Sequence, residues 1–317
     1  MKTKYLLYLI LGLAAFSVIL IILYVQKAAL ETEYNPIINP SEFSSEIDNR
    51  YFSLTSGKKM VYEAKTEEGT ERIEVYVTDE TRVVMGVETR VVWDRVWLNN
   101  SLIEDTKDWY AQDKEGNVWY FGEESVELID GKIVSYAGSW EAGIDGAQPG
   151  IIMKASPKVG DSYRQEYYKG EAEDMADVLA LNEDVKVPFG NFSGCLKTRD
   201  YTPLEIGADE YKYYCSEVGG VVLEVVVESD DKVELLTLGY NAKPSASAII
   251  SGELKTGISE ERAKEIALKR VPGKITDFGI EKKFGKPTYI VEIAADSGVE
   301  TDVIIDIDTG EILGVET

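Results

Sequence analysis

Short alternating strands separated by turn residues dominate the chain from residue 51 to residue 240. In runs such as residues 72–79 and 88–98, β-branched and aromatic residues alternate with charged ones, the period of two that half-buried strands show. Glycine and asparagine turns divide these runs. The pattern restricts this region to an antiparallel β-rich domain. We expect either a two-sheet sandwich or one strongly curved half-barrel.

The β-rich region divides into two similar halves, residues 51–137 and 156–238. In each half a glycine turn (Gly57, Gly160) leads into an aromatic strand. A second glycine (Gly86, Gly190), about thirty residues later, precedes a strand that contains Thr-Arg. The repeated order predicts an internal duplication. It also favours a strand over a helix for residues 171–181, because their counterpart in the first half alternates.

The tryptophans and one glycine-rich loop are the candidate ligand-binding features of this region. The first half contains all five tryptophans of the chain: Trp93, Trp97, Trp109, Trp119 and Trp140. They either fill the core of a sheet or form a platform for a sugar or an apolar ligand. The loop at residues 138–150 joins the halves, has four glycines and shows no apolar period. Because long loops often carry binding residues, we expect a ligand site to include Trp140, Asp145 and Gln148.

The N-terminal residues predict the cellular location of the protein. Residues 5–25 form an uncharged apolar run that is long enough to cross about 30 Å of hydrocarbon as a helix. Lys2 and Lys4 precede it, so residues 1–4 are expected in the cytoplasm and the body outside it. A cleaved signal peptide is the alternative. Residues 26–50 contain Pro36 and Pro40 and predict a stalk. The expected location is therefore the cell membrane, with a single pass and an extracytoplasmic body.

Two further features suit an exported body. Cys195 and Cys215 are the only cysteines and occur in adjacent predicted strands. An oxidising compartment permits a disulfide between them, and two separate buried thiols are the alternative. Asn99 and Asn191 each begin an Asn-X-Ser triplet that matches the glycosylation sequon.

Composition excludes several classes of function. A net charge of −24 argues against nucleic acid and anionic lipid as partners, since both require a basic face. The chain has no histidine, which excludes zinc sites of the HExxH type, Ser-His-Asp triads and Cys-His dyads. We therefore expect no enzyme, no metal and no cofactor. A carboxylate-based hydrolase is the remaining catalytic option, and it requires two buried carboxyls in a cleft.

The C-terminal segment, residues 258–317, follows a predicted linker at residues 241–257 and combines one helix with short strands. Ser259 is the expected N-cap, and Glu260 and Glu261 place negative charge at the start of the helix. Pro272 and Gly273 end that helix. From residue 289 the apolar positions recur with a period of two. These signals predict an α+β unit with a helix packed on an antiparallel sheet.

This segment resembles the PepSY domain in its ISEERAKEIAL start, its Pro-Gly stop and its DTGE turn at residues 308–311. PepSY domains occur in propeptides of thermolysin-like metallopeptidases and in many surface proteins. The resemblance implies regulation of another protein rather than catalysis. The DTGE turn and Asp306 carry carboxylates in the pattern of an EF-hand start, but the segment is too short to supply the later ligands. A hairpin turn, not a calcium site, is therefore expected.

Together these features predict a membrane-anchored, exported and non-catalytic protein. Its PepSY-like domain is expected to bind or regulate another surface protein, such as a peptidase or another envelope protein. Two alternatives remain open. The β-rich domain could bind a lipid or glycan, or the chain could be a structural envelope protein. Any small ligand is unidentified at this stage.

Overall fold

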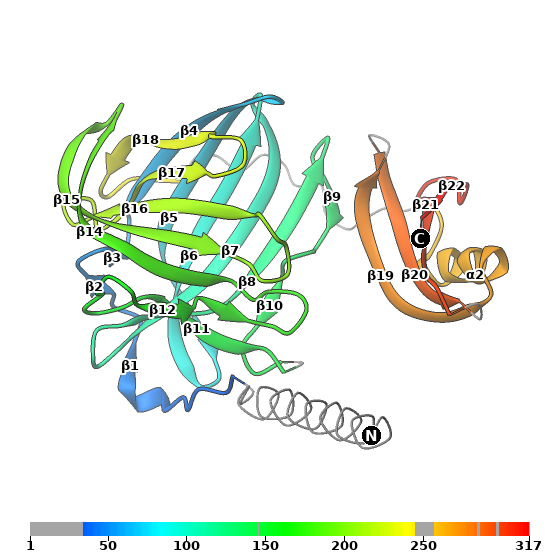
Figure 1. Ribbon diagram of the computed structural model, residues 1–317, viewed down its shortest axis with the longest axis horizontal. Helices are drawn as coiled ribbons and strands as arrows, with labels where there is room; N and C mark the ends of the chain where they lie inside the picture. Colours follow the sequence, from blue (N-terminus) through cyan, green and yellow to red (C-terminus); the bar gives the residue numbers. More distant parts are fainter. Residues whose placement is uncertain (1–33, 145, 245–256, 284–285, 296–297, 317) are drawn as a thin grey trace, which may run out of the picture. The chain divides into compact units, whose positions relative to one another are not determined.

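The computed structural model describes residues 34–144, 146–244, 257–283, 286–295 and 298–316. Residues 38–244 form one β-rich domain, here called the barrel domain, and residues 257–316 form a small α+β module (Figure 1). The expected linker at 241–257 lies largely outside the described residues.

A single antiparallel sheet of 16 strands makes up most of the barrel domain. Its first meander consists of β4 (Lys59–Thr66), β5 (Gly69–Val84), β6 (Val87–Leu98), β7 (Ser101–Asp113) and β8 (Val118–Ile129). Its second meander consists of β14 (Met175–Val187), β15 (Gly190–Tyr201), β16 (Asp209–Cys215), β17 (Gly220–Val226) and β18 (Lys232–Gly239). Because β18 pairs with β4, the two meanders are two walls of one sheet.

Short strands between the meanders almost close this sheet. They are β11 (Gln148–Met153), which pairs with β8, β12 (Ser162–Arg164), which pairs with β14, and β13 (Glu166–Tyr167), which pairs with β11. β12 and β13 are the two ends of the strand order, yet only Gln165 separates them in the chain. The chain thus passes from one edge of the sheet to the other at Gln165. The result is one nearly closed barrel-like sheet (Figure 1).

This arrangement corrects the predicted two-sheet sandwich or open half-barrel. The cause is non-local: the pairing of β18 with β4 merges the two halves, and the crossing at Gln165 brings the edges together. Gln165 also ties the crossing to the second meander, because its Nε2 donates a hydrogen bond to Asp200 Oδ2 at 3.0 Å. Neither the pairing of β18 with β4 nor the crossing at Gln165 changes the local alternation of apolar and polar residues. The sequence pattern therefore did not predict them.

Tight turns set the register of the first meander. Asn99 and Asn100 both have positive φ, 49° and 68°, and connect β6 to β7. Met85 and Gly86, at 50° and 80°, connect β5 to β6 in the same way. Two residues of positive φ match the twist of the flanking strands. The register matters for function, because a slip of one residue would move each inward side chain to the outer face.

The end of the predicted stalk packs onto the barrel domain. It contains the 3-10 turn η1 (Pro40–Glu42) and the strands β1 (Phe43–Ser44) and β2 (Asp48–Asn49), and β3 (Phe52–Ser53) follows. β1 pairs with β7. Ile47 is only 4% exposed and belongs to the core. Residues 43–50 are therefore part of the folded domain.

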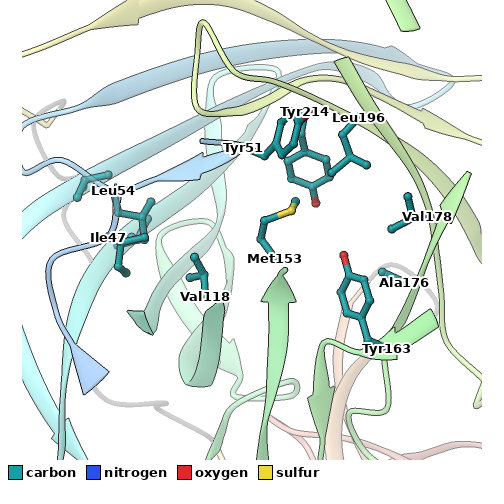
Figure 2. Packing of buried hydrophobic residues seen from close by; sticks show 12 residues of the cluster. Ile47, Tyr51, Leu54, Val118, Met153, Tyr163, Ala176, Val178, Leu196 and Tyr214 are labelled. Carbon is teal, nitrogen blue, oxygen red and sulfur yellow. The ribbon is translucent and has the colours of Figure 1, made fainter. Parts of the chain in front are cut away.

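One core cluster joins the two meanders through β11. Met153 of β11 lies between Val118 of the first meander and Leu196 and Tyr214 of the second (Figure 2). Val118, Met153 and Leu196 are fully buried. Burying an aliphatic side chain of this size contributes about 1.5–3 kcal/mol. This cluster fills part of the interior and borders the cavity described below.

The C-terminal module is a four-stranded sheet with one helix. Its elements are α2 (Glu260–Arg270), β19 (Gly273–Lys283), β20 (Lys286–Ala295), β21 (Glu300–Asp306) and β22 (Ile312–Glu316). Ser259 caps α2, and its hydroxyl accepts a hydrogen bond from the backbone N–H of Arg262 at 3.3 Å. Ala263 and Ala267 are fully buried against apolar side chains of the sheet, which include Val291. The capping residue and the small residues thus hold the helix on the sheet.

The predicted fold class included a transmembrane helix at residues 5–25, which lie outside the described residues. Within the described part of the chain, no helix is long and apolar enough to cross a membrane. The fold class is corrected to a nearly closed barrel-like domain and a C-terminal α+β module. The predicted single-pass location in the cell membrane is withdrawn, because no helix among the described residues supports it.

Candidate functional site

A cavity of about 250 Å³ lies inside the barrel domain and is called the barrel cavity below. Strands of both meanders line it. Its apolar lining includes Met60, Ile73, Val75, Val92, Val221 and Val233. Four ionisable groups also line it: Asp94, Asp108, Lys212 and Glu224. The cavity is therefore amphipathic, which is typical of a site that orients a ligand through a few polar groups.

Strand parity explains how charged side chains reach the interior. On β6, Val92 and Asp94 line the cavity, whereas Trp93 and Arg95 occupy the alternate positions on the opposite face. Asp94 therefore stands at an apolar position of an otherwise regular strand. Its cross-strand partners are Val75 of β5 and Thr106 of β7. Barrel closure then surrounds its carboxyl with protein.

Asp94 has an unsatisfied carboxylate oxygen. Its Oδ1 is buried and accepts no hydrogen bond from the described residues. Burial raises the pKa of Asp94 well above its ordinary value, and the nearby carboxyls of Asp108 and Glu104 raise it further. Lys212 opposes this shift. A buried acceptor without a donor is costly and uncommon in folded proteins.

Asp108 is the second carboxyl of the cavity, and a tyrosine hydroxyl holds it. Tyr120 Oη donates a hydrogen bond to Asp108 Oδ1 at 2.7 Å, and the ring of Tyr120 stacks on that of Tyr110 at 4.8 Å. Burial raises the pKa of Asp108, although the bond from Tyr120 opposes the shift. Its cross-strand partner Glu123 also has a raised pKa, chiefly from burial and then from the charge of Asp108.

Lys212 is the cation that lines the cavity, and three carboxylates share it. Its Nζ lies 3.3 Å from Glu210, 3.6 Å from Glu224 and 3.7 Å from Asp200. Burial alone would lower the pKa of Lys212, but these three carboxylates outweigh it and raise the pKa well above its ordinary value. These carboxylates therefore favour the charged form of Lys212, and its ion pairs are with groups other than Asp94 and Asp108.

Three other buried polar atoms also lack a hydrogen-bond partner among the described residues. Asp200 Oδ1, Thr198 Oγ1 and Tyr163 Oη are buried and make no hydrogen bond with the described residues. Thr198 is the cross-strand partner of Lys212. Within the described residues, the interior of the barrel domain thus contains buried polar atoms without a hydrogen-bond partner on β12 and β15.

Two of the three residues predicted in a ligand-binding loop, Trp140 and Gln148, lie in strands. Trp140 belongs to the short strand β10 (Trp140–Glu141) and is 5% exposed. Its Nε1 donates a hydrogen bond to Glu166 Oε2 at 2.9 Å. Gln148 begins β11 and pairs with Tyr167. Asp145 lies outside the described residues. Neither Trp140 nor Gln148 lines the barrel cavity.

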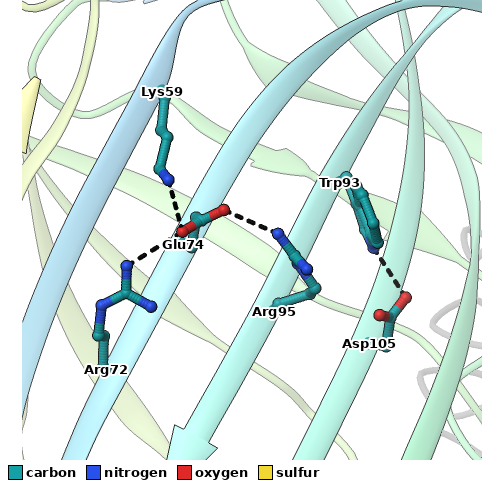
Figure 3. Close-up of polar contacts among 6 residues, drawn as sticks. All are labelled: Lys59, Arg72, Glu74, Trp93, Arg95 and Asp105. Carbon is teal, nitrogen blue, oxygen red and sulfur yellow. Dashed lines mark hydrogen bonds and ion pairs between the residues drawn. The ribbon is translucent and has the colours of Figure 1, made fainter. Parts of the chain in front are cut away.

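The face of the sheet opposite the cavity carries a closed charge network (Figure 3). Glu74 is fully buried and pairs with Arg95 at 2.7 Å, Lys59 at 2.7 Å and Arg72 at 3.1 Å. The guanidinium of Arg95 lies 3.9 Å from the ring centroid of Trp93. Glu74 balances one of the three positive charges, and its ion pairs join β4, β5 and β6. None of these charged groups lines the barrel cavity.

The structure also locates the predicted modification residues. A disulfide joins Cys195 of β15 to Cys215 of β16, with their Cα atoms 4.4 Å apart. Asn99 is exposed, but its Nδ2 donates a hydrogen bond to the carbonyl of Glu68 at 3.2 Å. Asn191 is exposed on β15. Glycosylation at either asparagine stays a prediction.

The DTGE turn of the C-terminal module is organised by its own backbone. Asp306 Oδ1 accepts hydrogen bonds from the backbone N–H groups of Asp308 at 3.0 Å and Thr309 at 2.9 Å. Gly310 has φ 75°, which suits glycine. The Asp306 carboxylate therefore has a structural role in the turn. No cluster of three or more potential metal ligands occurs among the described residues.

Asp94, Asp108, Lys212 and Glu224 were not identified from the sequence. A signal was available for Asp94 and Glu224, because each is an ionisable residue within an apolar strand run. Lys212 gave no comparable signal, because polar and aromatic residues alternate along β16. Only the closed barrel brings the four together.

Comparison with known proteins identifies one part of the chain. Residues 257–316 match the model of the family described as "Peptidase propeptide and YPEB domain", abbreviated PepSY. No curated protein matches the chain.

Several solved structures are similar at low scores. A candidate lipoprotein from Parabacteroides distasonis has a TM-score of 0.32 and 11% identity, covering 60% of this chain and 98% of its own. MucB has a TM-score of 0.30 and 8% identity, covering 85% and 81%. The Pseudomonas aeruginosa MucA/MucB complex has a TM-score of 0.30 and 10% identity, covering 78% and 73%. Scores of this size are not evidence of a shared function or partner. The family match, together with the helix and sheet at residues 257–316, shows that this chain carries a PepSY domain at its C-terminus.

Proposed function

We propose that this chain is an exported, non-catalytic binding protein whose barrel cavity holds a small amphipathic ligand. The observation that carries the proposal is the barrel cavity itself, whose lining combines apolar residues with the unsatisfied oxygen of Asp94. A bound polar group would satisfy this carboxylate, and the apolar wall would take up the rest of the ligand. The disulfide between Cys195 and Cys215 supports export, because disulfides persist in oxidising compartments.

The electrostatics favour binding over hydrolysis. Two buried carboxyls, Asp94 and Asp108, do share the cavity, as a carboxylate-based hydrolase would require. Glycosidases, however, keep one carboxyl protonated and the other ionised by giving them different environments. Here burial raises the pKa of both carboxyls. A pair of buried carboxyls that both favour the protonated form lacks the ionised carboxylate that this reaction requires.

A cavity-filling variant tests this proposal. The purified full-length chain is screened by thermal unfolding against amphiphiles with cationic, polyhydroxyl and anionic head groups. A ligand at 100 times its Kd should stabilise the fold by about 2.7 kcal/mol. Val233→Phe places a larger side chain in the lining of the barrel cavity. It should exclude the ligand and abolish this stabilisation. If no amphiphile stabilises the wild type, or if the variant responds equally, the barrel cavity is not the binding site.

The PepSY domain supports a second binding function. Its family description refers to peptidase propeptides, so we propose that this domain engages a peptidase or another envelope protein. Increasing concentrations of the full-length chain should slow substrate cleavage by a thermolysin-like metallopeptidase. Ala267→Asp introduces a carboxylate under α2 and should abolish the inhibition, whereas Val233→Phe should retain it. Absence of inhibition by the wild type would argue against a peptidase of this type as the partner.

A further inference from the structure

We propose that the ligand of the barrel cavity is an organic cation, with an ammonium group on a short apolar arm that contains an aromatic ring. This inference rests on the proposed function of the cavity and specifies the chemical class of its ligand. It rests on the numbers of carboxyl groups and cations in the cavity lining, the position of Asp94, and the volume and aromatic lining of the cavity.

The lining of the cavity has more carboxyl groups than cations. Asp94, Asp108 and Glu224 line it together with the single cation Lys212. Lys212 is engaged by Glu210, Glu224 and Asp200, all within 3.7 Å. No ion pair links Asp94 or Asp108 to a cation among the described residues. Without a compensating charge, burial favours the protonated form of Asp94 and Asp108, and a bound cation would offset this by favouring the ionised form.

The two carboxyls lie close enough together to share one ammonium group. Asp108 is the cross-strand partner of Val92, and Asp94 follows two residues later on the same strand face. Residues in this diagonal relation have Cα atoms about 7–8 Å apart, and their side chains approach further. Asp94 Oδ1 accepts no hydrogen bond from the described residues, whereas Asp108 Oδ1 is bound by Tyr120. An ammonium group has three donors and would satisfy Asp94 first.

The remainder of the cavity fits an aromatic arm. Tyr62, Tyr110 and Tyr214 line it beside the aliphatic wall. Tyrosine ring faces attract cations, and their edges pack against other rings. In an engineered protein, a cavity of roughly 150 Å³ is enough to bind benzene. The volume of about 250 Å³ therefore accommodates a ring with a short aminoalkyl chain.

Other ligand classes fit these observations less well. A metal ion would require a cluster of ligating side chains, and none occurs among the described residues. An anionic ligand would add negative charge beside Asp94, Asp108 and Glu224, where burial already disfavours the ionised carboxyls. A neutral polyol would hydrogen-bond to the carboxyls but would not use the apolar lining.

Three probes that differ mainly in charge test the inference. The full-length chain is titrated calorimetrically with 2-phenylethylammonium, the neutral 2-phenylethanol and the anionic 3-phenylpropionate. We expect 2-phenylethylammonium to bind at least about tenfold more tightly than 2-phenylethanol, and 3-phenylpropionate not to bind. In Asp94→Asn, affinity for the cation should fall by about tenfold or more. Because asparagine keeps the shape of this side chain and cannot ionise, the fold should be at least as stable as that of the wild type.

Matched controls separate the possible outcomes. Asp79→Asn removes an exposed carboxylate of β5 and should leave all three affinities unchanged. Equal binding of the cation and the neutral probe, or unchanged cation affinity in Asp94→Asn, overturns the inference and leaves the proposed function intact. If the three probes fail while another amphiphile of the screen binds and Val233→Phe blocks it, the inference alone fails. If nothing binds, both the inference and the proposed function fail.

Discussion

The hydroxyl of Tyr120 donates a hydrogen bond to Asp108 Oδ1 at 2.7 Å inside the barrel domain. The bond links β8 to β7 and places a donor on a carboxyl that also borders the barrel cavity. Asp94 lies on the same side of the cavity and has no such donor on Oδ1. The difference between these carboxyls assigns Asp108 a structural partner and leaves Asp94 for a ligand.

The bond between Tyr120 and Asp108 should stabilise the fold most when Asp108 is ionised. Tyr120→Phe removes the donor and leaves a buried carboxyl oxygen without it, which should cost about 1–3 kcal/mol in free energy of unfolding at pH 8. At pH 5 the loss should be smaller, because a protonated Asp108 depends less on the donor. Urea unfolding at the two pH values measures the difference. Tyr136→Phe, which alters an exposed tyrosine, is the control and should change little. An equal loss at both pH values would contradict the assignment.

The barrel domain should lose stability as pH rises through neutrality. Burial raises the pKa of Glu166 from its ordinary 4.5 to about 7. Between these values the unfolded chain releases a proton that the folded chain keeps, so the free energy of unfolding falls as pH rises from about 4.5 to 7. Asp108 and Glu123 are shifted in the same direction. The Tm should therefore be higher at pH 5 than at pH 8.

Glu166→Gln tests the contribution of Glu166 to that slope. The variant cannot ionise, so its Tm should depend less on pH between 5 and 8 than that of the wild type. Glu171→Gln, at an exposed position nearby in the sequence, should keep the wild-type slope. A wild-type Tm that rises over this interval would show that the interior carboxyls are not held protonated.

The loss of stability on removing a charge from the outer face of the sheet should depend on how deeply that charge is buried. Glu74 is fully buried and pairs with Arg95, Lys59 and Arg72. Glu74→Gln leaves the fully buried Arg95 without its carboxylate and should cost about 3–5 kcal/mol. Arg72→Gln removes a side chain that is 40% exposed and should cost no more than about 1 kcal/mol. Denaturant unfolding compares them, and similar losses would contradict the argument from burial.

The disulfide should contribute substantially to stability. Cys195 and Cys215 are separated by 20 positions in the chain. Closing a loop of that length restricts the unfolded chain and stabilises the fold by about 3 kcal/mol. The double variant Cys195→Ala, Cys215→Ala should unfold at a correspondingly lower denaturant concentration. Added reductant should destabilise the wild type but not the variant. If reductant has no effect on either protein, the two thiols are not joined in solution.

The DTGE turn should depend on the Asp306 side chain and not on calcium. Asp306→Ala removes the acceptor for the backbone N–H groups of Asp308 and Thr309 and should destabilise the PepSY domain by about 1–3 kcal/mol. Asp308→Ala, at an exposed position, should have little effect. Neither calcium nor a chelator should shift the Tm of the wild type. A calcium-dependent increase in Tm would mean that the turn binds the ion.

Local signals predicted the C-terminal module better than the barrel domain. Ser259 caps α2, and the period of two from residue 289 places Tyr289, Val291 and Ile293 in the module core. These features depend on residues a few positions apart, so the sequence contains them. The position of Trp140 was harder to predict. Its glycine-rich surroundings suggested a loop, but β10 pairs with β8 and buries the ring.

The sequence alone determined where strands, turns and the capped helix form, because alternation, positive-φ turn residues and capping act over a few residues. It also determined the disulfide candidates and the PepSY resemblance. Only the tertiary structure decided that the two halves make one nearly closed sheet, since β18 pairs with β4 across more than half of the chain. Closure in turn created the barrel cavity and enclosed Asp94. A carboxylate on an open sheet would be solvated, and the same residue inside a barrel becomes an unsatisfied acceptor.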